Sequence, residues 1–387
     1  MKRLAIATLL IPILLTACSE EKKPVEQAPA AAPPPANAEA GRQIAEKHCT
    51  SCHGLDGLST GPDVPHIAAQ KADYMVVAMG EYGSGLRGHA ALQELVSKLE
   101  KTDGRNVAAW YAGQKPPVPK PVAADAATRK QNPLDAGKEM AAACGGCHGP
   151  DGNGAVPGMP SLAGMAPAYL TAAILSYKKD GGTRADPVMG EFVTALDRAK
   201  SEAVALYYGT QKPKSRGPAA LGDAAAGEPL SGGCGGCHGQ KGVSTDPKTP
   251  SLAGQDATYF MKAVKAYRDG TRKHEAMKGL VAALSDGDIQ NIAAFYAAQE
   301  PKAAEVNLPL TAEQWAERCD RCHANGAAAN PALVVPILNA QREEYLEHAL
   351  TAYRDGKRKQ STMHVMGAPL SDSEIKAIAA YYAARAR

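Results

Sequence analysis

Eight of the nine cysteines in this 387-residue chain belong to four Cys-x-x-Cys-His motifs. The motifs are Cys49/Cys52/His53, Cys144/Cys147/His148, Cys234/Cys237/His238 and Cys319/Cys322/His323. This pattern is the attachment signature of c-type haem. The two thiols add to the haem vinyl groups, and the adjacent histidine binds the iron from the proximal side. The sequence therefore predicts four haem c groups, each with two cysteine attachments and one proximal histidine.

Two other chemistries use Cys-x-x-Cys pairs. A zinc site needs its ligands to pair in space, and a thioredoxin-like redox motif occurs once, beside a strand and a helix. Four copies, each followed directly by histidine, favour haem over both. With these eight cysteines used, none remains for a disulfide among them.

Each motif belongs to a longer repeat. A proline lies twelve or thirteen residues after the motif histidine, a tyrosine follows nine residues later, and a second tyrosine eight residues after that. The sets are Pro65/Tyr74/Tyr82, Pro160/Tyr169/Tyr177, Pro250/Tyr259/Tyr267 and Pro336/Tyr345/Tyr353. An eight-residue step keeps both rings on one face of a helix. Each repeat then closes with a helical segment that holds two adjacent aromatic residues, so the predicted fold is all-α.

The repeats give four predicted domains separated by polar, proline-containing linkers. Their predicted boundaries are 39–115, 132–212, 222–300 and 309–387. Domains of roughly 80 residues form marginal cores unaided. Aromatic residues make up only 5% of the chain. We therefore expect each haem to supply apolar mass that the side chains lack. The sequence leaves open which domains pack together.

A methionine stands five residues after a loop arginine in three repeats, at Met189, Met277 and Met363. A thioether suits iron(II) and raises the potential of a histidine-ligated haem. The alternative is that these side chains only pack the core. Their shared register in haem-bearing repeats predicts that they are distal ligands, with Met366 as a competitor of Met363.

The first repeat departs from this register, because Leu92 stands where the others have methionine. His89 lies in the same loop, and we predict it as the distal ligand of haem 1. The alternatives are an open or water-bound iron, or ligation by Met79, Met75 or His66. A second imidazole would lower the potential, so haem 1 is expected to differ from the others.

The loop arginine of each repeat is expected to lie near a haem propionate and to compensate its charge. These residues are Arg87, Arg184, Arg272 and Arg358. The alternative is an arginine that forms a solvated surface pair.

The amino terminus has the pattern of a targeting segment. Lys2 and Arg3 precede a short apolar run over residues 4–15, and Leu15-Thr16-Ala17-Cys18 follows. This resembles a bacterial lipoprotein signal over residues 1–17, with Cys18 acylated as the first mature residue. Residues 18–38 read as a flexible tether rich in alanine and proline. Serine after Cys18 favours the outer membrane by family analogy, and the domains are expected in the periplasm.

The repeats resemble class I bacterial cytochromes c, most closely the tandem-domain dihaem cytochrome c4 group. The third repeat carries the resemblance best, in residues 234–239, 250–255 and 267–272, with Met277 and residues 284–286. The resemblance implies four helical domains, each wrapped around one haem with His/Met ligation. It also implies electron transfer in the periplasm. The doubling to four domains and the missing methionine of the first repeat depart from the family pattern.

Two classes of function follow. The first is a lipid-anchored carrier that takes electrons from a quinol-oxidising complex or a dehydrogenase to an oxidase, reductase or soluble cytochrome. The second is a peroxidase-like or ligand-binding haem protein with an open distal site at haem 1. A cytochrome subunit of a larger dehydrogenase lies between them. The balance of 43 basic and 40 acidic residues argues against nucleic-acid binding. The sequence contains no nucleophile triad and no phosphate-binding loop, so we predict no separate catalytic domain.

Overall fold

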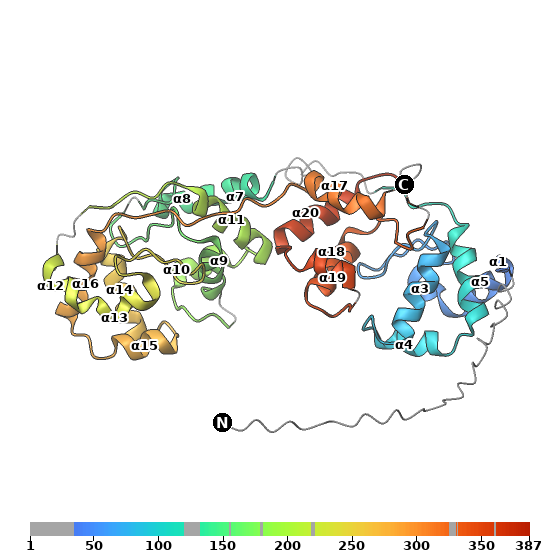
Figure 1. Ribbon diagram of the computed structural model, residues 1–387, viewed down its shortest axis with the longest axis horizontal. Helices are drawn as coiled ribbons and strands as arrows, with labels where there is room; N and C mark the ends of the chain where they lie inside the picture. The colour runs from blue at the N-terminus through green and yellow to red at the C-terminus, as the bar shows by residue number, and fades with distance from the viewer. Residues whose placement is uncertain are drawn as a thin grey trace, which may run out of the picture. The chain divides into compact units, whose positions relative to one another are not determined.

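The structure is a computed structural model that describes residues 35–119, 132–154, 156–178, 181–217, 221–324, 330, 332–359 and 361–387. The predicted signal segment, Cys18 and most of the predicted tether lie outside these ranges. Residues 37–387 form one compact unit. In the described ranges no residue belongs to a β-strand, and the regular elements are helices (Figure 1). The all-α prediction is confirmed.

The helices divide among the four repeats, which we call domains 1 to 4. Domain 1 contains α1 (Ala38–His48), α2 (Thr50–His53), α3 (Ala72–Gly83), α4 (Ala90–Ser97) and α5 (Lys101–Ala112). Domain 2 contains α7 (Pro133–Ala141), the 3-10 helix η1 (Ala142–Cys144), α8 (Gly145–His148), α9 (Pro167–Ser176), α10 (Pro187–Val193) and α11 (Arg198–Thr210). Domain 3 contains α12 (Ala224–Leu230), α13 (Gly232–His238), α14 (Ala257–Arg268), α15 (Glu275–Val281) and α16 (Asp286–Ala297). Domain 4 contains α17 (Ala312–His323), α18 (Glu343–Arg354), α19 (Ser361–Gly367) and α20 (Asp372–Ala383).

Two of the closing helices, α16 and α20, begin with a capping box. The Ser285 hydroxyl accepts a hydrogen bond from the Asp288 N–H at 3.1 Å, and the Ser371 hydroxyl accepts one from the Glu374 N–H at 3.3 Å. In both boxes the acidic side chain bonds back to the serine N–H, so two unpaired donors of the helix end are satisfied. In domain 3 the helix before the motif is interrupted around Ser231, where α12 ends and α13 begins.

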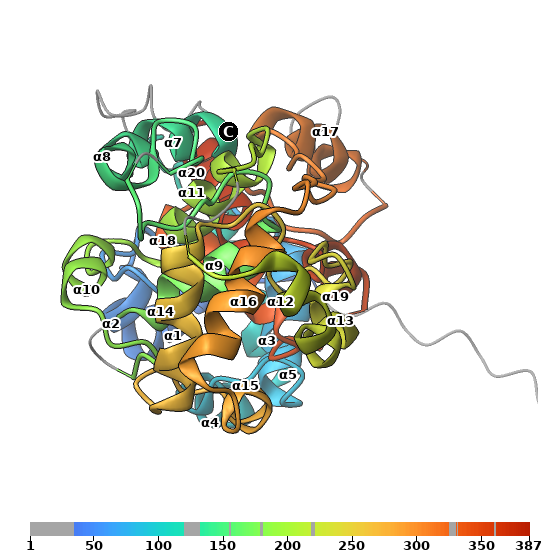
Figure 2. The ribbon, with the colours of Figure 1, turned by 90° about the vertical axis from the view of Figure 1, so that its left-hand side faces the viewer.

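The first and last helices of each domain pack against each other, as α12 and α16 do within domain 3 (Figure 2). In three domains a glycine of the first helix sets the distance. A Cβ at Gly41 would lie 1.9 Å from the Asn106 carbonyl oxygen. At Gly227 the corresponding distance to the Asn291 oxygen would be 2.0 Å. Only glycine permits this approach, which closes the domain around its motif.

The second aromatic residue of each closing helix lies at the centre of its domain. Tyr111, Tyr208, Tyr296 and Tyr382 are the largest fully buried side chains. The first cysteine of every motif packs against the same cluster as the buried tyrosine of its domain. Each core is therefore built directly behind the site at which haem attaches.

The domains pair in a nested order, domain 2 with domain 3 and domain 1 with domain 4. An isolated antiparallel bridge joins Arg184 to Arg272, and a second joins Arg87 to Arg358. The backbone N–H of Lys273 bonds the Thr183 carbonyl at 2.9 Å in the first pair. The corresponding bond in the second pair runs from Lys359 to Leu86 at 3.1 Å. We call domains 1 and 4 the outer pair, because they are the first and last in the sequence. Domains 2 and 3, which follow each other in the sequence, are the inner pair.

Domains 2 and 4 connect the two pairs through α11 and α20. The Lys376 ammonium lies 2.8 Å from an Asp197 carboxylate oxygen, and the Ser373 N–H bonds Glu202 at 3.2 Å. Lys376 and Asp197 are each 46% exposed, so their ion pair contributes little stability. The contacts therefore run in the order domain 1, domain 4, domain 2, domain 3. No described helix has the length and apolar character needed to cross a membrane.

Candidate functional site

Each Cys-x-x-Cys-His motif ends a helix, and its histidine is the last helical residue. These helices are α2, α8, α13 and α17. Glycine follows the histidine in three domains, at Gly54, Gly149 and Gly239, with φ between 71° and 79°. This left-handed conformation is easy for glycine alone, and it turns the chain sharply away from the helix.

The motif histidines all make the same hydrogen bond. Nδ1 of each ring lies 2.8–3.1 Å from the carbonyl oxygen of the repeat's proline. The pairs are His53–Pro65, His148–Pro160, His238–Pro250 and His323–Pro336. A carbonyl oxygen only accepts, so Nδ1 carries the proton and the lone pair is left on Nε2. The structure thus orients four imidazoles as a metal-binding histidine must be oriented.

Burial keeps these imidazoles neutral. It lowers the pKa of each motif histidine, and the hydrogen bond to proline opposes the shift only in part. A neutral ring with a free Nε2 is the form that binds iron. The donor set therefore fits a haem iron on this side.

The first thiol of each motif is half-buried against the core of its domain. Burial raises the pKa of the Cys49 thiol to about 11, and it also raises the pKa of Cys144, Cys234 and Cys319. These four sulfur atoms therefore lie where the inner edge of a haem would meet the core.

The second thiol of each motif is exposed. These residues are Cys52, Cys147, Cys237 and Cys322. The cause is the helical turn at the end of the motif. Successive residues of a helix differ in direction by about 100°, so a motif histidine that points inward turns the cysteine before it toward solvent.

The unequal burial still suits two covalent bonds to one haem edge that runs from core to surface. None of the eight motif cysteines forms a disulfide. The attachment of haem through Cys52, Cys147, Cys237 and Cys322 stays a prediction.

The three predicted methionine ligands lie on short helices of their domains. Met189 is on α10, Met277 on α15 and Met363 on α19, and each is half-exposed. Met277 packs against the cluster that also contacts Cys234, so the predicted ligand and the attachment site share one core. In α10 and α15 the N-cap side chain accepts a hydrogen bond from the methionine N–H.

In domain 1 the corresponding helix α4 carries Leu92 at that place. The His89 side chain caps α4, and its Nδ1 accepts the Leu92 N–H at 3.2 Å. The competing candidates lie elsewhere. Met75 is buried between α3 and α5, and Met79 packs against the same cluster. The role of His89 as distal ligand stays a prediction.

The loop arginines meet at the paired faces rather than in solvent. Each guanidinium lies over both tyrosine rings of its own repeat, 5.3–5.7 Å from the ring centroids. Arg272 also donates to the Tyr177 hydroxyl of domain 2 at 2.8 Å. Arg87 forms a buried ion pair with Glu81. The eight-residue tyrosine spacing therefore builds a clamp for arginine at each interface.

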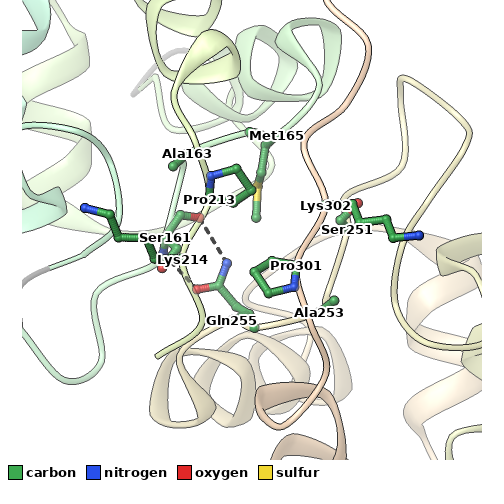
Figure 3. A pocket seen from close by; sticks show the side chains of 12 residues that line it. Ser161, Ala163, Met165, Pro213, Lys214, Ser251, Ala253, Gln255, Pro301 and Lys302 are labelled. Carbon is green, nitrogen blue, oxygen red and sulfur yellow. Dashed lines mark hydrogen bonds between the residues drawn. The ribbon is translucent and has the colours of Figure 1, made fainter. Parts of the chain in front are cut away.

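Sequence reasoning missed the glutamines that bind the paired domains together. Gln70 bonds both backbone groups of Ile337 at 2.9–3.1 Å, and Gln341 bonds both backbone groups of His66 at 2.7–2.9 Å. Gln255 does the same to Ser161 at 2.8–3.0 Å, as the dashed lines of Figure 3 show. A signal was present, because each glutamine lies five residues after the repeat's proline.

In domain 2 the residue five positions after the proline is Met165 instead of a glutamine. The inner pair is therefore not symmetric. Met165 and Ser251 line a pocket between domains 2 and 3, together with Pro213 and Pro301 (Figure 3). The outer pair therefore has two glutamine clamps and the inner pair has one. Beside Gln255, Asp256 of domain 3 forms an ion pair at 3.1 Å with Arg216 of the linker that follows domain 2.

The chain is similar to known proteins over most of its length. Residues 38–117 and 134–210 match the family described as Cytochrome c. Residues 309–381 match the family described as Cytochrome C oxidase, cbb3-type, subunit III.

Individual relatives are similar to about two domains at a time. Cytochrome c4 of Pseudomonas aeruginosa is 34% identical over 177 residues, which are 42% of this chain and 88% of the relative. Cytochrome c4 of Azotobacter vinelandii is 32% identical over 186 residues, covering 42% of this chain and 89% of the relative. The thiosulfate dehydrogenase electron acceptor of Thiomonas intermedia is 36% identical over 174 residues, covering 41% of this chain and 79% of the relative.

Proposed function

Because this chain belongs to the class I c-type cytochromes and carries tandem domains for four haem c groups, we propose that it transfers electrons between redox proteins in the periplasm. The observation that carries this proposal is the fourfold histidine geometry. Every motif imidazole has Nδ1 committed to a proline carbonyl and Nε2 free for iron.

The haem, when bound, supplies a reversible one-electron couple. The chain's own residues hold it and set its potential. Two cysteines would hold the edge of each haem, one from the core side and one from the surface. The proline carbonyls hold the four proximal rings in one orientation. The proposed domains that hold the four haems span residues 39–115, 132–212, 222–300 and 309–387.

Met189, Met277 and Met363 are the proposed distal ligands of haems 2, 3 and 4. Their place at the third residue of α10, α15 and α19 supports this, because one register serves three domains. A thioether seals the iron against substrates, so these haems would exchange electrons and make or break no substrate bonds.

The four loop arginines are proposed to face haem propionates. Arg87 is 4% exposed and Arg272 is 7% exposed, and both are buried among tyrosines. A buried guanidinium needs anions close by. Among the described residues, Arg184, Arg272 and Arg358 form no ion pair with a carboxylate side chain, whereas Arg87 pairs with Glu81. Propionates would supply the missing charge.

The order of domain contacts supports a relay. Domain 1 contacts domain 4, domain 4 contacts domain 2, and domain 2 contacts domain 3. We therefore expect electrons to pass in the order haem 1, 4, 2, 3 or its reverse. The proposed donors are a quinol-oxidising complex or a dehydrogenase, and the proposed acceptors are an oxidase, a reductase or a soluble cytochrome. The thiosulfate dehydrogenase electron acceptor among the relatives supports a dehydrogenase donor.

Acylated Cys18 is the proposed membrane anchor, with the outer membrane as its site. The sequence around it supports this, and residue 18 lies outside the described ranges.

The test uses the full-length protein purified with its haems. Haem content is measured first, and four haems per chain are expected. The fully reduced protein is then mixed rapidly with an excess of an oxidised soluble class I cytochrome c. Release of four electrons per chain to the protein acceptor supports the proposal. Failure to exchange electrons with the cytochrome, despite four haems that a small reductant reduces, would overturn it.

A further inference from the structure

Leu92 of domain 1 occupies the place that a proposed ligand occupies in two other domains. In domain 2 the Met189 N–H donates to the Asp186 carboxylate at 2.9 Å, and in domain 3 the Met277 N–H donates to His274 Nδ1 at 3.3 Å. In domain 1 the Leu92 N–H donates to His89 Nδ1 at 3.2 Å. The helices therefore correspond residue by residue, and the third residue of α4 is a hydrocarbon.

His89 has the same structural role as His274. Each is the N-cap of its helix, and each stands edge-on to the second tyrosine of its repeat with ring centroids 6.2 Å apart. His274 does this in a domain that has its methionine. The imidazole of His89 is thus explained by helix capping.

The cap also fixes the tautomer of His89. Nδ1 accepts a hydrogen bond, so its lone pair is occupied and the neutral ring carries its proton on Nε2. Neither nitrogen then offers a lone pair to iron.

The remaining candidates of domain 1 have other roles in the packing of the chain. His66 directly follows Pro65, whose carbonyl binds His53, so His66 belongs to the proximal side. Its backbone is also held by Gln341 of domain 4. The Met79 methyl group lies 3.6 Å from the position of a Cβ on Gly104, which places it between α3 and α5. Met75 is buried in the same core.

We propose that haem 1 keeps an open distal position beside Leu92, where it binds a small uncharged diatomic molecule of the carbon monoxide or nitric oxide type. This inference rests on the proposed methionine ligation of the other haems. The binding is addition of the ligand's lone pair to the vacant position of the iron(II), with no atom lost. The Leu92 side chain favours an uncharged ligand, because an anion would lose its hydration there and find no hydrogen-bond donor or positive charge on leucine.

The experiment titrates the fully reduced, full-length protein with carbon monoxide and follows the absorption spectrum. The proposal expects one carbon monoxide per chain of four haems. It expects none in Leu92→Met, which restores the ligand of the other repeats. The matched control is His89→Asp, which removes the imidazole but keeps an N-cap acceptor like Asp186, and it should still bind one.

Each other outcome has a distinct meaning. A wild-type protein that binds no carbon monoxide would overturn the proposal, and binding gained by His89→Asp would then identify His89 as the ligand. More than one carbon monoxide per chain would overturn the methionine ligation on which the inference rests. Electron exchange with the soluble cytochrome is measured on the same samples. If it persists in a wild type that binds no ligand, the open site fails while the electron-transfer function stands.

Discussion

Glu81 distinguishes the domain 1 arginine from its three counterparts. The four loop arginines each donate their backbone N–H to the carbonyl of one helix residue, namely Glu81, Ser176, Ala266 and Ala352. Only the first of these has a carboxylate. Its side chain is 12% exposed and pairs with an Arg87 that is 4% exposed. A buried negative charge near a haem stabilises the oxidised iron.

We therefore predict that Glu81→Gln raises the midpoint potential of one haem, by on the order of tens of millivolts. Potentiometric titration of the holoprotein, followed by visible absorption, measures this. Ser176→Ala is the control at the matching position of domain 2 and should leave all four potentials unchanged. A potential that stays constant or falls in Glu81→Gln would contradict the assignment.

His66 makes the outer pair sensitive to acid. Burial, together with the charges of Arg342 and Arg387, lowers its pKa from 6.5 to about 4, and Asp56 opposes the shift in part. Its Nδ1 is buried with no hydrogen-bond partner among the described residues. Between pH 6.5 and pH 4 the unfolded chain binds a proton at His66 that the folded chain does not. The free energy of unfolding must therefore fall as the pH falls through this window.

The matched variant is His66→Ser, because serine stands at this position in domains 2 and 3. On going from pH 7 to pH 5, we expect the wild type to lose about 4 °C more in Tm than His66→Ser. Thermal unfolding of the holoproteins at constant ionic strength measures the difference. Equal losses in both proteins would show that His66 does not titrate in this range.

At the scale of elements, each domain depends on the close crossing of its first and last helices. A Cβ at Gly227 of α12 would lie 2.0 Å from the Asn291 oxygen of α16, so an alanine would push the helices apart. We predict that Gly227→Ala destabilises domain 3 by about 3 kcal/mol. The control is Gly279→Ala on α15, where a Cβ meets no atom within 4 Å. Denaturant unfolding of the holoproteins should show a lowered midpoint for Gly227→Ala alone.

The helices and the motif geometry were predictable because their signals are local. The capping boxes at Ser285 and Ser371 lie within four residues, and the proline that holds each motif histidine lies twelve or thirteen residues away. The interface between domains was not predictable in this way. Gln341 and His66 are separated by 275 residues, and nothing in the periodicity of either segment specifies the other. The glutamine register marks an interface, but not which domains form it.

The distal side of domain 1 was only partly predictable for a different reason. The sequence shows that Leu92 replaces methionine and that a histidine lies nearby. It does not show that Nδ1 of His89 accepts a hydrogen bond from the Leu92 N–H, because that bond depends on how the chain turns into α4.

At the scale of the molecule, the junction between domains 2 and 4 differs from the two paired interfaces. Its contacts include the exposed pair of Lys376 and Asp197, whereas the paired interfaces bury arginine and glutamine. Salt screens exposed charges much more than buried ones.

We predict that Lys376→Glu, or a salt concentration of about 1 M, weakens the contact between domains 2 and 4 and leaves the inner and outer pairs intact. Small-angle scattering of the holoprotein should report an increased radius of gyration. Electron equilibration within each pair should remain unchanged, while equilibration between the pairs slows. The control is Lys98→Glu, which changes an exposed ion pair inside domain 1. An increase of the radius in that variant would show that the effect is not specific to the junction.

The nested pairing also governs the order in which the protein is completed during synthesis. Domains 2 and 3 follow each other along the chain, so their interface forms as soon as the second of them is made. Domain 1 is made first, but its partner domain is made last. Until residues 309–387 arrive, the newly made domain 1 presents Gln70 and the Arg87 clamp to solvent without a partner. The nascent chain therefore completes its inner pair before its outer one.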